Sequence, residues 1–195
     1  ILHEQLQLGG RPMFMARLVL AATLSASYGI YGPAYELQEH VPREPESEEY
    51  LDSEKYQLRH WDLERADSLA AFTAHVNGIR RDNPALHENR SLRFVPTDNA
   101  QLIAYVKSTA ALDDIVLTVV NLDPRYTQSG WLDLDLAALG IEHDASYQMH
   151  DLLTDQRFVW QGPHNFVLLD PQRVPAHVFR LRRRVRAEQD FDYFE

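Results

Sequence analysis

The chain has 195 residues, a formal net charge of −10, 45% hydrophobic residues and no cysteine. This length supports one sizeable hydrophobic core or two small ones. The acidic balance argues against nucleic acid as a main partner, because neutralising phosphates requires clustered Lys and Arg. Without cysteine, neither disulfides nor thiolate metal sites can form, so a reducing, cytoplasmic compartment is expected. The longest apolar run, residues 18–24, is far shorter than the ~20 residues of a membrane span, which excludes a membrane partner of that kind.

Residues 9–37 predict a helix and a strand whose apolar faces cannot all be buried within this chain. Glycine and proline at residues 9–12 end one short helix and suit the first turn of the next. Residues 13–24 are apolar almost all round, which predicts a helix buried on most sides. Residues 28–31 are aromatic and bounded by turn residues, which predicts a short buried strand. Because this helix and strand could not bury both faces within the chain, we expect the C-terminal piece of a larger enzyme.

Residues 36–62 form a long acidic connection with two prolines, in which Tyr50, Tyr56 and Trp61 argue against a purely solvating loop. Residues 66–81 then carry apolar side chains at helical spacing and predict an amphipathic helix. Its last turn holds two arginines, which suit the helix dipole, and Asn83-Pro84 ends it.

From about residue 91 the hydrophobic period changes from helical to two. Turn residues separate the apolar runs, and Ile115–Asn121 is almost continuously apolar, which predicts a central strand. This pattern predicts an antiparallel β-sandwich or barrel. The expected strands are residues 92–95, 102–107, 115–121, 130–135, 146–151, 157–161, 166–169 and 177–182.

In this order of helix, strand, acidic connection, helix and β-sandwich, the chain resembles the α-amylase superfamily, glycoside hydrolase family 13. The resemblance rests on residues 27–37, SYGIYGPAYEL, which look like the eighth strand of a (β/α)8 barrel and the turn after it. The pattern departs from many amylases, because Ala34 rather than glycine precedes Tyr35-Glu36 and Pro33 lies within the turn. The resemblance implies an α/β part followed by an all-β part: residues 1–88 as the end of the catalytic barrel and residues 89–195 as an antiparallel β-sandwich domain.

Within the superfamily the chain is most similar to the α-1,4-glucan maltosyltransferases that use maltose 1-phosphate. The residues that carry this similarity include ILHE at 1–4, GGRP at 9–12, ARLVLAATLS at 16–25, EEYLDSEKY at 48–56, IRRDNPAL at 79–86 and VVNLDP at 119–124. The resemblance implies a retaining transfer of maltosyl units from α-maltose 1-phosphate to the non-reducing end of α-1,4-glucans, in glycogen-like glucan synthesis. The upstream barrel is then an expected partner, and a homodimer is left open.

The resemblance places the nucleophile, the acid/base and a third carboxylate upstream, so we assign no catalytic residue here. We therefore expect this chain alone to be inactive. No histidine pair has metal-ligand spacing and no glycine-rich phosphate loop is present, so neither a metal nor a cofactor is expected.

Lys55 and Tyr56 are the expected substrate-binding residues. The resemblance implies that this pair hydrogen-bonds sugar hydroxyls in the donor site, and an ammonium and a phenol offer suitable donors, an acceptor and a flat face. Read without the resemblance, Lys55 more simply pairs with Glu54 or Asp52 while Tyr56 packs.

Other charged residues favour structural roles. Glu36 follows the expected buried strand, where barrel active sites lie, and Glu4 lies near the expected upstream carboxylate. The resemblance gives neither a catalytic role, so both are interpreted as structural. Arg180, Arg182, Arg184 and Arg186 would share one face of a continued strand and are interpreted as a solvated or ion-paired edge, with the tail 182–195 extending over the surface.

Two alternatives stay open at this point. The chain could come from another enzyme of the superfamily, a hydrolase or a trehalose-forming isomerase. It could instead carry a non-catalytic carbohydrate-binding β-domain, for which Tyr126, Trp131, Phe158 and Trp160 are the available aromatic residues.

Overall fold

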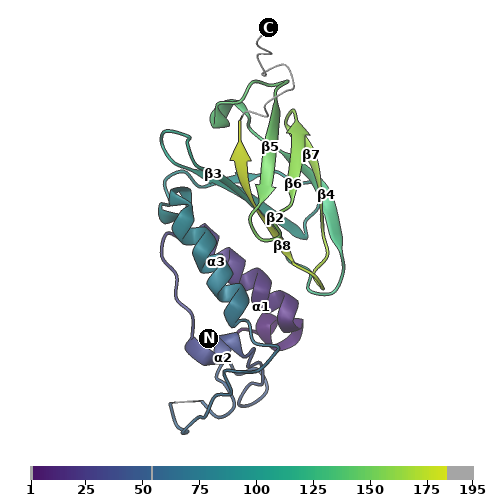
Figure 1. The fold of residues 1–195 in the computed structure, drawn as a ribbon. Helices are drawn as coiled ribbons and strands as arrows, with labels where there is room; N and C mark the ends of the chain where they lie inside the picture. Colours follow the sequence, from purple (N-terminus) through teal and green to yellow (C-terminus); the bar gives the residue numbers. More distant parts are fainter. Residues whose placement is uncertain (1, 54, 184–195) are drawn as a thin grey trace.

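The computed structural model describes residues 2–53 and 55–183, in which helices precede a β-sandwich (Figure 1). The helices are α1 (Glu4–Leu24), α2 (Gly32–Glu36) and α3 (Ala70–Asp82), with short 3-10 helices η1 (Pro84–His87) and η2 (Ala137–Leu139). The strands are β1 (Arg93–Val95), β2 (Leu102–Ser108), β3 (Ile115–Asn121), β4 (Gln128–Asp133), β5 (Ser146–Asp151), β6 (Arg157–Gln161), β7 (His164–Leu169) and β8 (Ala176–Arg182).

Two antiparallel sheets form the sandwich. One has the order β1-β2-β3-β8-β5-β6, and the other pairs β4 with β7. Each expected strand is present, and the bounds of β3, β5 and β6 are those that the hydrophobic pattern predicts. The all-β class of this part is therefore confirmed. The division into residues 1–88 and 89–195 stays a prediction.

Strand β3 is central because apolar layers cover both of its faces. Leu117 and Val119 belong to the core between the two sheets, together with Leu132 and Val167 of the smaller sheet. Val116 and Val120 belong to a second core, which the helices α1 and α3 close from outside. This double burial explains why the strand is apolar without alternation.

Helix α1 has a sharp bend that its sequence predicts. Gly10 has φ 58° and ψ −162°, a conformation that glycine adopts at little cost, and Pro12 opens the second half of the helix. Beyond the bend, Phe14, Val19 and Ala22 are fully buried. The expectation of a helix buried on most sides is confirmed for this half.

Helix α3 begins at Ala70, four residues later than the period predicts, although its buried face of Leu69, Val76 and Ile79 is the expected one. The Leu69 N–H donates to the Glu36 carbonyl at 2.7 Å, so a distant segment fixes where the helix starts. Figure 1 shows α1 and α3 side by side beneath the larger sheet.

Buried polar groups join the helices to the sheet. The Thr23 and Tyr105 hydroxyls lie 2.7 Å apart, and Lys107 Nζ lies 3.3 Å from the Leu86 carbonyl and 3.5 Å from that of Leu24. The Asp114 carboxylate accepts the Ala85 N–H at 2.9 Å at the start of η1. These contacts fix the helices against one face of the sheet.

The strand expected at residues 28–31 is wrong. These residues have no strand assignment, and the chain then turns directly into α2. A strand requires a neighbour to share backbone hydrogen bonds, and no described strand lies in either sheet beside this segment. We call residues 25–31 the extended segment.

The arginine run also differs from its interpretation as a sheet edge. Strand β8 lies between β3 and β5, so it is not an edge, although Arg180 is ion-paired, with Nε 3.5 Å from Asp114 Oδ1. Arg184, Arg186 and the part of the expected surface tail from residue 184 onward lie outside the described residues. Within residues 2–53 and 55–183, no helix is long and apolar enough to cross a membrane.

Candidate functional site

The acidic connection between α2 and α3 is ordered by Tyr50. An antiparallel bridge joins Pro42 to Tyr50, and the Leu51 N–H donates to the Val41 carbonyl at 3.0 Å. The Tyr50 ring is buried and stacks on Tyr31 of the extended segment, with 5.5 Å between centroids and 11° between planes. Burial and the neighbouring Tyr31 raise the pKa of Tyr50 to about 12, so its hydroxyl stays protonated at neutral pH.

A second anchor holds the far side of this connection. The Arg59 guanidinium lies 3.3 Å from a Glu39 carboxylate oxygen and 4.3 Å from the Trp61 ring centroid. It also donates to the Asp52 carbonyl at 3.1 Å. Together these two anchors position the short stretch between Tyr50 and Arg59.

Lys55 and Tyr56 lie in that stretch and both face solvent. Tyr56 is 61% exposed, Lys55 Nζ is 4.9 Å from its ring centroid, and Arg43 Cζ is 5.6 Å from the same ring. Hydrogen bonding and charge attraction from Tyr56 raise the pKa of Lys55, so the ammonium is charged. The structure thus brings both expected residues together on the surface. Glu54, one of the two carboxylates considered for Lys55, lies outside the described residues.

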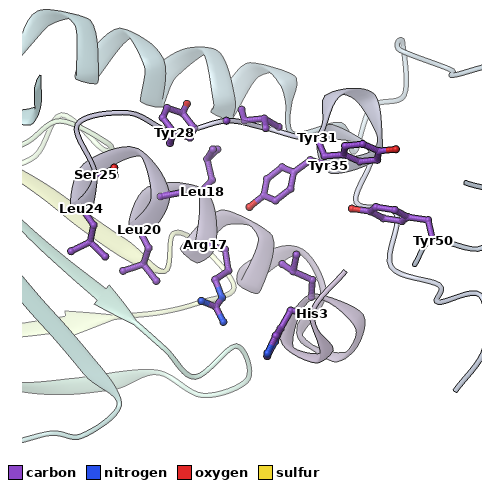
Figure 2. Close-up of a pocket in the computed structure, with 14 residues that line it drawn as sticks. His3, Arg17, Leu18, Leu20, Leu24, Ser25, Tyr28, Tyr31, Tyr35 and Tyr50 are labelled. Atoms are coloured by element: carbon purple, nitrogen blue, oxygen red, sulfur yellow. The ribbon is translucent and has the colours of Figure 1, made fainter. Parts of the chain in front are cut away.

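A groove of ≈570 Å³ runs between α1 and the extended segment (Figure 2). It is lined mainly by apolar side chains of α1, by the tyrosines of the extended segment and by Tyr50. His3 and Arg17 supply polar groups on the α1 side. Tyr35, which also lines the groove, donates its hydroxyl to the Phe14 carbonyl at 2.6 Å, so its ring is fixed against α1. We call this feature the helix groove.

Arg80 fixes the course of the extended segment, a role that sequence reasoning missed. Its guanidinium donates to the Ala22 and Ser25 carbonyls at 2.5 and 2.8 Å and to the Ala26 carbonyl, and Cζ lies 5.4 Å from the Tyr28 ring centroid. The sequence indicates only a cation in the last turn of α3. Nothing local shows that its targets are the carbonyls at the end of α1.

Neither carboxylate considered for catalysis is placed as an acid or base. Glu36 ends α2, and the contact found for it is the backbone bond from Leu69. Glu4 is exposed in the first turn of α1, where its charge suits the helix dipole. Among the described residues, no group of three or more His, Asp or Glu side chains could hold a metal ion.

The aromatic residues considered for sugar binding divide into two groups. Tyr126, Trp131 and Phe158 are 69, 53 and 37% exposed, whereas Trp160 is buried in the sandwich core. Trp160 is therefore not a surface platform.

Residues 94–181, which run from β1 to β8, match the model of the family described as GLGE, C-terminal. This region of the chain is similar to that family. The chain is 49% identical over 187 residues to the α-1,4-glucan:maltose-1-phosphate maltosyltransferase of Chlorobaculum tepidum, and the match covers 93% of this chain and 28% of the relative. It is 51% identical to maltosyltransferase 2 of Streptomyces coelicolor, covering 94% of this chain and 27% of the relative.

Residues 94–181 and the helices before them also resemble solved α-amylases in fold. The maltogenic α-amylase AmyB of Thermotoga neapolitana superposes with a TM-score of 0.61 at 15% identity, over 88% of this chain and 36% of that chain. The enzyme AmyP, in complex with maltotriose, gives 0.64 at 15% identity, over 87% and 34%. The resemblance to the maltosyltransferases is confirmed, and the likeness to the α-amylases is one of fold. The chain spans little more than a quarter of the length of the curated relatives.

Proposed function

We propose that this chain is the C-terminal part of a retaining glycosyltransferase that moves maltosyl units from α-maltose 1-phosphate to α-1,4-glucans. The observation that carries the proposal is identity of about half over nearly the whole chain to proteins with the maltosyltransferase name. In this proposal the catalytic carboxylates belong to an upstream barrel of the same polypeptide. The cytoplasmic location and the homodimer stay predictions.

The helix groove supports the proposed barrel as a packing partner. The groove is open and mostly apolar, and the extended segment beside it has no strand neighbour among the described residues. A strand supplied upstream would pair with the extended segment and cover the groove. The segment would then become the eighth strand that its sequence indicates.

Lys55 and Tyr56 are proposed to bind the sugar donor. The two anchors of their loop, Tyr50 and Arg59, limit the loop's freedom, so less entropy is lost when a sugar binds. The charged Lys55 ammonium and the exposed Tyr56 hydroxyl offer donors and an acceptor for sugar hydroxyls.

The test is phosphate release from maltose 1-phosphate by the full-length protein that carries this chain. Lys55→Ala is expected to lower kcat/KM for the donor about tenfold or more, because a charged hydrogen bond is lost. Tyr56→Phe, which removes only the hydroxyl, is expected to have a smaller effect in the same direction. Glu44→Gln, an exposed change in the same loop, is the matched control and should leave donor kinetics unchanged.

The outcomes separate the parts of the proposal. A full-length protein that hydrolyses glucan or isomerises maltose without releasing phosphate would favour another enzyme of the superfamily. Unchanged donor kinetics in Lys55→Ala would refute only the assignment of Lys55 to the donor site, not the proposed transferase activity. Phosphate release by this chain alone would contradict the location of the catalytic carboxylates.

A further inference from the structure

A second groove opens where the two sheets of the sandwich part. Strand β6 is one of the two edge strands of the larger sheet, and β7 follows it in the two-stranded sheet without pairing to it. Between them lies a groove of ≈530 Å³, lined among others by Gln156, Phe158, Phe166, Leu168, Arg173 and His177. We call it the seam groove. Figure 1 shows β6 and β7 side by side on the sandwich, whereas the connection between α2 and α3 lies at the far end of the helices.

Aromatic rings form the walls of the seam groove. Phe158 on β6 is 37% exposed and meets Phe179 and His177 edge to face, with centroids 5.8 and 6.3 Å away. Phe166 on β7 is 49% exposed and meets Trp131 in the same way at 5.5 Å. Each exposed ring is thus fixed by a neighbouring ring and offers an apolar face without first having to be ordered.

His177 gives this groove a fixed polar group. Its Nδ1 lies 2.9 Å from Oδ2 of Asp151, a carboxylate that is fully buried, and its ring stacks on Phe179 at 4.7 Å. The His177 ring lines the groove, and its Nε2 has no hydrogen-bond partner within the described part of the chain. A buried carboxylate therefore orients a histidine whose second nitrogen is available to a ligand.

The remaining polar groups favour a neutral ligand. Arg173 and Asp170 contribute one charge of each sign to the lining, and Gln156 and Thr154 contribute neutral hydrogen-bonding groups. A sugar has an apolar ring face and an edge of hydroxyl groups. It therefore matches a groove that offers aromatic ring faces together with one charge of each sign and neutral hydrogen-bonding groups. A polyanion would instead require clustered cations, and the chain carries a net charge of −10.

We propose that the seam groove is a glucan-binding site, separate from the proposed donor site, that holds a chain of the α-1,4-glucan acceptor. The identity of the sugar rests on the proposed function, whereas the groove itself rests on its lining residues and their ring contacts. Such a site would keep a long polymer on the enzyme between transfers. It would have no effect on acceptors too short to reach it.

Direct binding tests the site without any enzymatic activity. In native gels containing glycogen, the full-length protein that carries this chain is expected to be retarded. Phe166→Ala should raise the apparent dissociation constant for glycogen, measured from the retardation, about three- to tenfold, because one stacking face is lost. Arg173→Ala, a change at an exposed residue, should also raise this dissociation constant. Phe94→Ala is the matched control: Phe94 is 64% exposed on β1, away from the groove.

Kinetics then separate this site from the donor site. In the same protein, Phe166→Ala should raise the ratio of the KM for glycogen to the KM for maltotetraose, whereas Phe94→Ala should not. No retardation of the unmodified protein, or equal retardation of the Phe166→Ala and Phe94→Ala variants, would overturn the proposal. Absence of phosphate release with retained, Phe166-dependent glycogen binding would instead refute the proposed transferase and leave the groove assignment standing.

Discussion

Asp151 provides the sharpest test of how the sandwich is held together. It ends β5 and is fully buried, and its Oδ1 accepts the N–H groups of Leu153 and Val178, both at 3.2 Å. Its Oδ2 accepts from the Thr154 hydroxyl at 2.6 Å and from His177 Nδ1 at 2.9 Å. Both carboxylate oxygens are therefore needed, and the substitution Asp151→Asn replaces one of them with an amide donor.

The expected cost of Asp151→Asn is about 2–4 kcal/mol in the free energy of unfolding, which is the range for disturbing a buried, hydrogen-bonded charge. Thr154 can reverse its hydroxyl to accept from the new amide, but His177 must give up its Nδ1 proton. The measurement is urea-induced unfolding at pH 7. Asp155→Asn is the control: this exposed carboxylate in the turn between β5 and β6 pairs with His150, and its loss should hardly move the midpoint. Equal midpoints for the Asp151→Asn and Asp155→Asn variants would refute the reasoning.

The same residue gives a pH dependence with a defined sign. Burial raises the pKa of Asp151, but the hydrogen bond and charge of His177 outweigh it, so the pKa lies below its ordinary value of 3.8. The stability that the ionised carboxylate contributes is then fully present above that ordinary value, and it is lost as the pH falls through the lowered pKa. The stability difference between the unmodified protein and Asp151→Asn should shrink in that acidic range. A difference that does not change with pH would contradict the pKa direction.

Three further changes test the helical part and its contact with the sheet. Gly10→Ala should cost about 1–3 kcal/mol in the free energy of unfolding, because φ 58° with ψ −162° is a conformation that essentially only glycine adopts, whereas Gly29→Ala, with open space around it, should be close to neutral. Thr23→Val should cost about 1–2 kcal/mol, because it removes the partner of the buried Tyr105 hydroxyl; thermal unfolding measures both effects. Burial lowers the pKa of Lys107, so the unfolded chain binds more protons between that pKa and the ordinary value of 10.5. Stability should therefore rise with pH in that window, and Lys107→Met should remove the rise.

The strands could be predicted from the sequence because each follows from its own residues. Strands β5 and β7 alternate buried and less buried side chains, since only one of their faces meets the core. The start of α3 could not be predicted in this way. It depends on the bond between Leu69 and Glu36, whose partners are distant in the sequence.

The candidate sites were predictable to different degrees. Lys55 and Tyr56 were identified through the family resemblance, because no local pattern distinguishes them from a surface pair. The order of their loop depends on Tyr50 stacking on Tyr31, a contact between distant residues. The seam groove was not predicted, since it exists only where the edge of β6 meets β7. The aromatic residues Phe158 and Trp131 were noted in the sequence, but their exposure required the fold.

The extended segment shows why a correct local pattern can still give a wrong local structure. Its aromatic residues and flanking turns are typical of a strand, yet a strand is stable only when its backbone groups have partners. Here Arg80 donates to the Ser25 carbonyl at the start of the segment, and Tyr31 at its end stacks on Tyr50, so both ends are held. Between them lie residues of the helix groove, whose apolar lining is open. A segment fixed at both ends beside an open apolar groove is what the last strand of a barrel would be without its neighbours, and this is the strongest structural support for the proposed upstream barrel.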